Sequence, residues 1–510
     1  MTSSTAGATG SANYVETILR GLSRDSDHIA FHLEDGSTIS HGEFGELVHR
    51  IAHTLSDHGI RSGSTVALLS ANRPEILATR YAANLLGARI VYLYEGLAVE
   101  VQSAIVSDVD TDILVADNRL AARAAEIVAE VPVKALLTLG PASTGSDLLA
   151  LAAAADSSPV PPHPVAPGDT WSVRHTGGTT GHPKGILMPS GGYRAMLEHQ
   201  ATAQGADVVY LISTTLAHGA GNLADGVFAA GGTIVLHERF APAQVLADIE
   251  RHRVTDLFLL PPLLYRVLDD PASASTDTSS LRRFLYFGCA ASPTRIGQAL
   301  DRFGPILFQI YGQSEAGGIS MLTEADHQRP ELLDSVGRPI PGVEVAIRDE
   351  QGNDLPVGQT GEICVRSAMT SAGYWRNPEL TAQVWRDGWV HTGDVGHLDE
   401  QGYLRLTSRL KDMIIVVGGH VYPVEVEEAL LGHPGIAEAA VYGVRAEDAA
   451  ELVHAAVVPR PGHTLTEQEV REHVASQLGA LYTPHHVEFL DRIPLTDAGK
   501  PDKKVLRARH

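Results

Sequence analysis

The sequence is poor in lysine, cysteine and aromatic residues. Only six of its 39 basic residues are lysines, so arginine supplies most of the positive charge. These lysines are Lys134, Lys184, Lys411, Lys500, Lys503 and Lys504. Two cysteines, Cys289 and Cys364, are too few for a disulfide framework and lack zinc-ligand spacing. No apolar stretch reaches the roughly 18 residues of a membrane span. These absences argue against a disulfide-stapled domain, a zinc module and a membrane-spanning protein.

The chain does have acidic charge and an ordinary globular composition. Its 510 residues carry a net charge of −22, with 44% hydrophobic and 20% charged residues. That length fits about three domains of ~150 residues, and the acidic surface argues against binding nucleic acid or an anionic membrane. Residues 1–13 are small and polar, which predicts a disordered tail rather than a signal peptide. We therefore expect a soluble cytoplasmic protein.

Short apolar runs alternate with amphipathic segments across much of the chain, which predicts strands separated by helices. The predicted strands are Thr65–Leu69, Arg89–Leu93, Ile113–Ala116, Ala135–Leu139, Asp207–Ile212, Thr233–Leu236 and Asp256–Leu260. The predicted helices are Arg73–Leu86, Leu120–Val131, Leu223–Ala230 and Pro242–His252. This alternation predicts an α/β fold with parallel sheets covered by helices.

The last third of the chain has a different pattern. Over residues 335–408, short strands separated by Gly, Asp and Pro turns predict a small β-rich subdomain. Residues 413–510 follow a βαββαβ pattern, with helices expected at Pro423–Leu431 and Thr466–Leu478. About 100 residues of this pattern are enough to fold separately. We therefore expect a small α+β domain at the C-terminal end.

The most informative segment is Arg174–Gly185, RHTGGTTGHPKG. After an apparent strand, it combines hydroxyls, glycines and a lysine, namely Thr176, Gly177, Gly178, Thr179, Thr180, Gly181 and Lys184. Glycines let backbone amides surround an anion, hydroxyls donate hydrogen bonds and lysine adds positive charge. The segment lacks the Gly-Lys-Ser/Thr order of a P-loop. It predicts a phosphate-binding loop of another kind.

This segment resembles the T-S-G-T-T-G-x-P-K-G loop of the adenylate-forming (ANL) superfamily, with Gly177 in place of the usual serine. That superfamily includes acyl- and aryl-CoA synthetases, peptide-synthetase adenylation domains and firefly-type luciferases. The resemblance implies an N-terminal adenylation domain over residues 14–408 and a mobile C-terminal lid domain over 413–510. A hinge at 409–412, with Lys411 at the pivot, would join the two domains.

Other segments match the superfamily in the same order along the chain. Phe287–Ala291 resembles the adenine-binding strand end, Gln309–Glu315 resembles Y-G-x-T-E, Trp389–Asp394 resembles W-x-x-T-G-D, and Arg409 lies in the hinge motif. The resemblance implies that the nucleotide is bound by the residues of the phosphate loop together with a second set of residues. This second set is Gly288, Cys289, Ala290, Tyr311, Gly312, Ser314, Asp394 and Arg409. The resemblance further implies that Glu315, with Thr176, holds Mg²⁺.

Lys500 lies in Pro494–Lys500, PLTDAGK, which resembles the C-terminal P-x-T-x-x-G-K motif. The resemblance implies that Lys500 is catalytic, together with Thr176 and Glu315, because its charge offsets two anions that must approach each other. The residues that the resemblance places in the substrate pocket are His218, Gly219, Asn222, Gln313, Gly317, Gly318 and Met321. Gly418, Gly419 and His420 would line a tunnel for the acceptor thiol.

The implied reaction uses ATP to activate a carboxylic acid and then transfers the acyl group to a thiol. We expect an aryl, arylacrylic or medium acyl acid, with coenzyme A as acceptor and a monomeric or homodimeric enzyme. Three alternatives remain open. In the first, the acceptor is the pantetheine of an acyl carrier protein instead of coenzyme A. In the second, the enzyme activates nitrite for diazotisation of an aryl amine. In the third, the chain is a non-catalytic nucleotide-binding protein.

Overall fold

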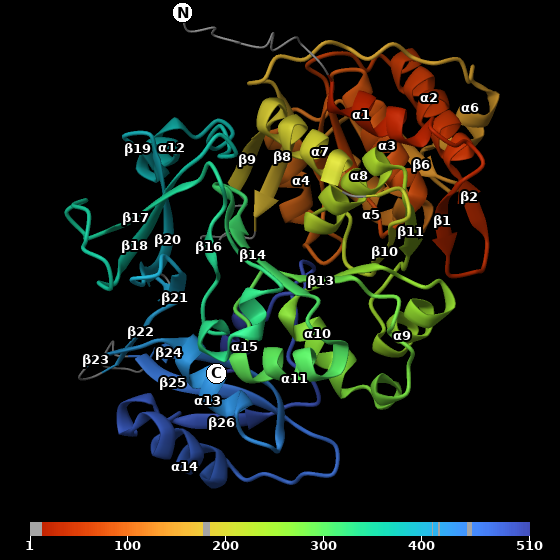
Figure 1. Ribbon diagram of the computed structural model, residues 1–510. Coiled ribbons are helices and arrows are strands. Elements are labelled where there is room, and N and C mark those ends of the chain that lie inside the picture. The colour runs from red at the N-terminus through yellow and green to blue at the C-terminus, as the bar shows by residue number, and fades with distance from the viewer. Residues whose placement is uncertain (1–12, 177–183, 204, 411, 417–418, 446–450) are drawn as a thin grey trace, which may run out of the picture. The chain divides into compact units, whose positions relative to one another are not determined.

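A computed structural model describes residues 13–176, 184–203, 205–410, 412–416, 419–445 and 451–510. Residue contacts divide the chain into two compact units. Figure 1 labels their helices and strands. The first unit comprises Met1–Arg239 with Ser371–Thr381, and the second comprises Phe240–Thr370 with Ala382–His510. Each unit is described separately below.

The first unit is built on a seven-stranded sheet in the order β7-β6-β5-β3-β4-β8-β9. Its strands are β3 (Thr65–Leu69), β4 (Arg89–Tyr92), β5 (Ile113–Asp117), β6 (Ala135–Leu139), β7 (Ser146–Asp147), β8 (Thr170–Thr176) and β9 (Lys184–Pro189). All neighbours are parallel except β8 and β9, which are antiparallel. A second group of strands has the order β10-β11-β1-β2. They are β1 (Ile29–Leu33), β2 (Thr38–Ser40), β10 (Val209–Ile212) and β11 (Thr233–Leu236).

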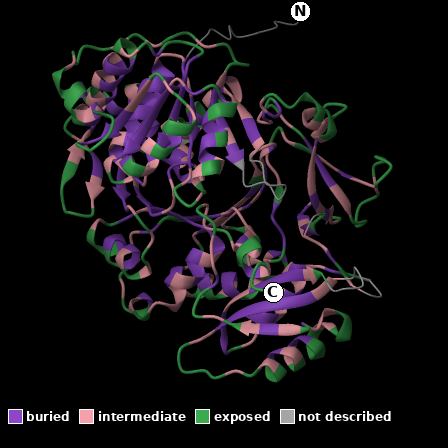
Figure 2. Ribbon diagram, turned by 180° about the vertical axis from the view of Figure 1, so that it is seen from behind, coloured by how far each residue is buried: buried purple, intermediate pink, exposed green. Residues whose placement is uncertain are grey.

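The helices of the first unit cover both faces of the seven-stranded sheet. They are α1 (Tyr14–Leu22), α2 (His41–Asp57), α3 (Pro74–Leu85), α4 (Val99–Asp108), α5 (Ala121–Glu130), α6 (Leu148–Ala154), α7 (Ser190–Ala203) and α8 (Gly219–Ala230). Alternate residues of β3 such as Ala67 and Leu69 pack with α4 and α5, while the intervening Val66 and Leu68 are also buried. Burial on both faces explains why these strands are continuous apolar runs in the sequence. Figure 2 shows the buried residues concentrated along the strands.

The second unit begins with strands in the order β16-β15-β14-β13-β12. They are β12 (Asp256–Leu259), β13 (Arg283–Tyr286), β14 (Leu307–Gln313), β15 (Gly317–Leu322) and β16 (Arg338–Pro339), with helices α9 (Pro242–Arg251), α10 (Pro261–Asp269) and α11 (Pro293–Phe303). Strands β12, β13 and β14 are parallel, and β15 returns antiparallel to β14. Each of these helices begins with proline, which suits the first helical turn because its amide needs no partner there.

An antiparallel sheet follows, in which β17-β18-β20-β19 are neighbours and β21 pairs with β20. Its strands are β17 (Glu344–Arg348), β18 (Gly361–Arg366), β19 (Trp385–Arg386), β20 (Trp389–Leu398) and β21 (Leu404–Arg409). Helix α12 (Pro378–Val384) begins in the Ser371–Thr381 segment. Ile363, Val365, Val390 and Leu404 form the core of this sheet together with Tyr311 of β14.

The C-terminal part of the second unit is a small α+β arrangement. Its elements are β22 (Ile414–Val416), β23 (Gly419–Val421), α13 (Pro423–Leu431), β24 (Ile436–Arg445), β25 (Glu451–Pro459), α14 (Glu467–Leu478), β26 (His486–Phe489) and α15 (Lys503–Arg507). Strand β25 is antiparallel to β24 and parallel to β26. Short 3-10 turns complete the fold: η1 (Asn118–Leu120), η2 (Pro271–Ala274), η3 (Asp326–Gln328), η4 (Pro330–Leu332) and η5 (Ala480–Tyr482).

This architecture confirms the predicted α/β fold class, with a β-rich subdomain and a small C-terminal α+β region. Among the helices in the described part of the chain, none combines the length and apolar character that a bilayer crossing needs. Both cysteines are free thiols.

Candidate active site

The predicted phosphate loop connects β8 to β9 in the first unit. These strands are antiparallel, and Thr176 pairs with Lys184 where the loop begins and ends. Lys184 is partly exposed, and its Nζ lies 5.9 Å from the ring centroid of Tyr374. The loop residues Gly177, Gly178, Thr179, Thr180 and Gly181 lie outside the described residues, as does the side chain of Thr176. Their predicted contacts with phosphate stay predictions.

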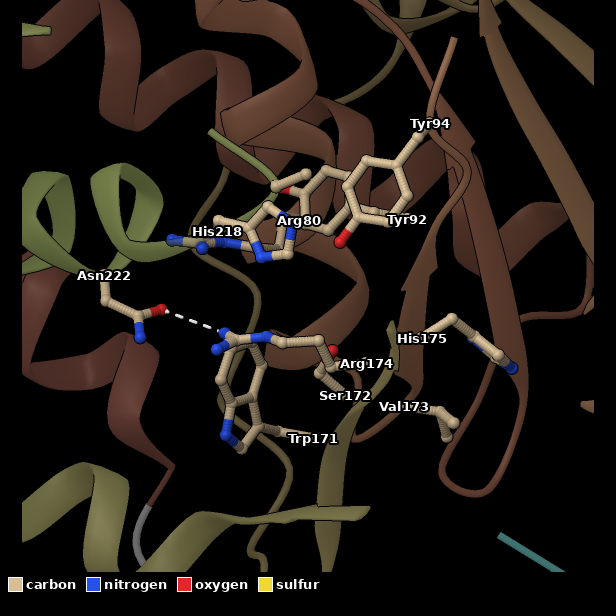
Figure 3. Close-up of a pocket in the computed structure, with 11 residues that line it drawn as sticks. Arg80, Tyr92, Tyr94, Trp171, Ser172, Val173, Arg174, His175, His218 and Asn222 are labelled. Atoms are coloured by element: carbon tan, nitrogen blue, oxygen red, sulfur yellow. Dashed lines mark hydrogen bonds between the residues drawn. The ribbon is translucent and has the colours of Figure 1, made fainter. Parts of the chain in front are cut away.

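A pocket lies in the first unit between β4, β8 and the start of α8 (Figure 3). We call it the Arg174 pocket, and its main lining residues are Tyr92, Tyr94, Trp171, Arg174, His218 and Asn222. The rings of Tyr94 and His218 are stacked, with centroids 4.9 Å apart and planes at 13°. Of the predicted substrate-pocket residues, this pocket therefore contains His218 and Asn222. Gly219 is the first residue of α8, directly after His218.

Arg174 is a charged residue in strand β8, whose other residues are a mixture of polar and apolar side chains. Side chains alternate along a strand, so Arg174 shares a face with Ser172, whereas Val173 and His175 face the other way. Its Nη2 donates to Asn222 Oδ1 at 3.5 Å (Figure 3). Burial lowers the pKa of the Arg174 guanidinium, because desolvation disfavours a charge.

A second arginine that lines the pocket, Arg80, is part of a buried cluster around Asp225. Arg80 forms an ion pair with Asp225, and the hydroxyls of Tyr81 and Tyr193 donate to the same carboxylate. The Arg80 and Asp225 side chains are 1% and 0% exposed. Burial raises the pKa of the Asp225 carboxyl, and Arg80 and the tyrosines oppose this rise. These four residues, the Asp225 cluster, use one another as partners and hold α3, α7 and α8 together.

In the second unit, the predicted adenine-binding strand end follows β13. Gly288 has φ of +108°, and a Cβ at this position would lie 3.1 Å from Leu260 Cδ2. A side chain here would therefore be both strained and crowded. Burial raises the pKa of the neighbouring Cys289 thiol to about 12. This thiol stays protonated at neutral pH, as expected for a packing residue rather than a nucleophile.

Lys500 lies beside this strand end within the second unit. Its Cε is 3.8 Å from the position that a Cβ on Gly288 would occupy. A turn presents the lysine, in which Thr496 N donates to Lys500 O at 2.8 Å and Gly499 N donates to Thr496 O at 2.7 Å. Arg266 of α10 donates to Ile493 O, just before this turn, at 3.1 Å, and it makes two 2.9 Å hydrogen bonds to Glu438 of β24.

Three of the predicted nucleotide-binding residues form a compact group in the second unit. Arg409 Nε lies 2.8 Å from Asp394 Oδ1, and the Tyr311 hydroxyl donates to Asp394 Oδ2 at 2.6 Å. Burial and the Asp394 carboxylate both raise the pKa of Tyr311. Burial acts to lower the pKa of Arg409, but the carboxylates of Asp394 and Asp412 outweigh it and raise this pKa. The structure thus brings together three residues that lie far apart in the sequence.

The turn that carries Asp394 is fixed by residues that sequence reasoning missed. Glu362 Oε1 accepts from Gly393 N at 3.1 Å, and Glu362 Oε2 lies 2.7 Å from His391 Nδ1. The Thr392 hydroxyl donates to Ile363 O at 2.7 Å. His391 pairs with Cys364 across β18 and β20, and Glu362 lies two residues before Cys364, so only the strand register reveals the contact. These bonds orient the backbone that precedes Asp394.

The remaining predicted residues flank these groups. Gly312 pairs with Gly318 across β14 and β15, Gln313 pairs with Gly317, and Met321 pairs with Ile310. Ser314 and the partly exposed Glu315 lie in the turn between these strands. A carboxylate oxygen is the hard donor that Mg²⁺ prefers, so Glu315 fits a magnesium-binding role. Gly419 and His420 belong to β23. Lys411 and Gly418 lie outside the described residues.

Taken together, the fold and these groups define an adenylate-forming enzyme, and comparisons with known proteins agree. The family model for AMP-binding enzymes matches residues 20–375, and the model for their C-terminal domain matches residues 425–500. The chain belongs to this family, which confirms the predicted superfamily. It is an ATP-dependent adenylate-forming ligase.

Several relatives match over nearly the whole chain. A medium/long-chain fatty-acid–CoA ligase from Mycobacterium tuberculosis is 33% identical, covering 96% of this chain and 89% of its own length. A feruloyl-CoA synthase from an Amycolatopsis species is 34% identical, covering 95% and 97%. The solved structure of an amide bond synthetase from Marinactinospora thermotolerans is 40% identical, with a TM-score of 0.87 and coverage of 97% and 99%.

Proposed function

We propose that this enzyme activates a small carboxylic acid as an acyl-adenylate and transfers the acyl group to coenzyme A. The observation that carries the proposal is the Asp394–Tyr311–Arg409 group, in which a carboxylate, a phenol and a guanidinium form a polar site of the kind that binds nucleotides. The relatives that act on fatty and aryl acids support the acid and the acceptor.

In the first half-reaction, a carboxylate oxygen attacks the α-phosphorus of ATP, and the bond to the bridging oxygen breaks to release pyrophosphate. Asp394 would accept hydrogen bonds from the ribose hydroxyls, while Lys184 and the loop hydroxyls would bind phosphate oxygens. Lys500 would offset the charge of the attacking carboxylate and the α-phosphate. Mg²⁺, held by Glu315 and Thr176, would supply further positive charge against the phosphates.

In the second half-reaction, the thiol sulfur attacks the acyl carbon, its proton passes to solvent, and AMP leaves with the bonding electrons. We propose that residues 413–510 rotate about Lys411 between the two steps, so that Lys500 withdraws and Gly418, Gly419 and His420 line the thiol path. The contact of Arg266 with Glu438 would have to break during this motion. No residue has to serve as a covalent nucleophile.

A second candidate function is transfer of the acyl group to an amine instead of a thiol. The 40% identity with an amide bond synthetase over 97% of this chain favours it. Presenting the purified enzyme with a preformed adenylate and either coenzyme A, a loaded carrier protein or an aryl amine would separate these acceptors. A nitrite-plus-amine reaction without organic acid tests activation of nitrite in the same assay.

The central test is the exchange of pyrophosphate into ATP with a panel of acids, using Lys500→Ala. Loss of a positioned charge at the reacting oxygens is expected to slow adenylation by about 100-fold or more. Thioester formation from a preformed adenylate should change less than about threefold, because this step needs no lysine at the phosphate. Lys504→Ala, an exposed lysine in α15, is the matched control. Equal loss of both half-reactions would rule out the proposed rotation.

A further inference from the structure

The Arg174 pocket contains a positive charge that no carboxylate in the described part of the chain neutralises. Within the described parts of the chain, no carboxylate lies within ion-pair distance of Arg174. Its hydrogen-bond partner is the neutral amide oxygen of Asn222, at the long distance of 3.5 Å. A guanidinium remains charged across the physiological range even when its pKa falls.

The other charges at the pocket cancel. Arg80 is paired with Asp225, so this ion pair adds no net charge. Tyr81 and Tyr193 already donate to Asp225, and this carboxylate is fully buried. Asp225 is therefore committed to its own cluster. One unit of positive charge, on Arg174, is left facing the pocket, and a partly buried charge without a counter-charge is unfavourable.

The walls of the pocket restrict the shape of a ligand. Tyr92, Tyr94, Trp171 and His218 surround Arg174 with ring systems, and the Tyr94 and His218 rings lie nearly parallel. The enclosed space has room for about one water-sized group, within an empty volume of about 280 Å³ that includes open solvent. Flat walls and a guanidinium together suit a small planar oxyanion group such as a carboxylate, since a guanidinium can donate two parallel hydrogen bonds to it.

We propose that Arg174 binds an anionic oxygen group of the substrate other than the carboxylate that is adenylated. The inference rests on the proposed acid activation and names its substrate class, an aromatic acid with a second acidic group. A small inorganic oxyanion such as nitrite offers the same chemistry, and the experiment distinguishes the two sources. Asn222 is a positioning residue here, because its amide oxygen orients the guanidinium.

The test compares Arg174→Gln with the unaltered enzyme in pyrophosphate exchange, using matched acids. Terephthalate and 4-carboxycinnamate carry the second carboxylate, whereas benzoate and cinnamate lack it. Loss of a charge-assisted hydrogen bond should raise KM for the diacids about 10- to 100-fold and leave kcat within about threefold. KM for the monoacids should stay the same or fall. Arg174→Lys keeps the positive charge but cannot donate two parallel hydrogen bonds to one anion, so it should give an intermediate KM for the diacids.

Two further arms identify the source of the anion and separate this inference from the proposed function. Nitrite-dependent exchange that Arg174→Gln abolishes would show that Arg174 binds the anion that is activated, and it would overturn the assignment of a second anionic group. Binding of terephthalate without ATP, measured as a thermal shift, should depend on Arg174 even if no acid supports exchange, an outcome that would reject the proposed function alone. Equal KM changes for diacids and monoacids, with no Arg174-dependent thermal shift, would overturn the inference. Far-ultraviolet circular dichroism of both variants verifies folding.

Discussion

Both units of the molecule contain an aspartate that is bound by an arginine and by tyrosine, yet the two groups differ in burial. In the first unit, Arg80 and Asp225 are 1% and 0% exposed, and two tyrosines complete the cluster. In the second unit, Asp394 is 5% exposed but its partner Arg409 is 43% exposed. The two groups contain the same residue types, and they differ in how exposed the arginine is.

This difference decides what each group can do. Removing a fully buried ion-pair partner strands a charge in a low-dielectric interior, so the Asp225 cluster cannot exchange its partners for a ligand. Arg409 keeps much of its hydration, so Asp394 can exchange this contact for ligand hydroxyls at little cost. We infer that the Asp225 cluster is structural and that the Asp394 group is available for binding.

The largest effect is expected from Asp225→Ala, which would strand the Arg80 charge. Unfolding of the first unit should become easier by about 3–5 kcal/mol, the range observed when one partner of a buried pair is removed. Hydrogen–deuterium exchange of the β3 and β8 amides measures this opening within the first unit. The matched control is Asp394→Ala, which should leave those amides unchanged. A loss below about 1 kcal/mol for Asp225→Ala would show that the cluster is not structural.

A buried histidine in the first unit makes the stability of that unit depend on pH. His175 is 2% exposed, and burial lowers its pKa to about 4. The unfolded chain binds this proton near pH 6.5, so His175 stabilises the fold fully above pH 6.5, and the contribution is lost as the pH falls toward 4. Between pH 7 and pH 5 the loss amounts to about 2 kcal/mol. His175→Gln should remove this part of the pH dependence, measured by exchange of the same amides.

Two results would contradict that expectation. An identical pH profile for His175→Gln would mean that other groups carry the acid sensitivity of the first unit. An effect on amides of β20 in the second unit that equals the effect on β8 would show that the change is not local. His218→Gln is the control, because His218 belongs to the same unit but its ring is partly exposed.

Much of the fold could be predicted from the sequence, because buried strands form continuous apolar runs. The predicted strands Thr65–Leu69 and Ala135–Leu139 coincide with β3 and β6, and the predicted helix Pro423–Leu431 coincides with α13, which begins at a proline. Helices α2 and α7 were not predicted. Their sequences mix polar residues and glycine into the helical pattern, and tertiary packing rather than local propensity stabilises such segments.

The candidate site was predictable only where local motifs carry it. Tyr311, Asp394 and Arg409 were assigned from motifs, and the structure places them in contact. The Arg174 pocket was not predicted as a unit, because Tyr94, Trp171 and His218 are distant in the sequence and meet only through the strand order. An arginine within the strand that leads into the phosphate loop was the available signal. The roles of the individual residues in binding and catalysis stay predictions.

The smallest change in free energy is expected from Asp394→Asn. This variant tests the difference between the Asp394 group and the Asp225 cluster directly. An asparagine keeps the size of the side chain but replaces one acceptor oxygen with a donor. KM for ATP should rise about 10-fold, equivalent to about 1.4 kcal/mol, since one charged acceptor for the ribose hydroxyls is lost. The free energy of unfolding should change by less than about 1 kcal/mol, because Arg409 is substantially exposed.

Steady-state pyrophosphate exchange at varied ATP, with the acid at saturation, measures this KM, and urea unfolding measures stability. The 2′-deoxy analogue of ATP sharpens the result. If Asp394 accepts from the ribose 2′-hydroxyl, the analogue should raise KM in the unaltered enzyme and add little further in Asp394→Asn. Additive losses would place the 2′-hydroxyl elsewhere. A variant that loses stability but keeps its KM would make Asp394 a structural aspartate like Asp225, and the distinction by exposure would then fail.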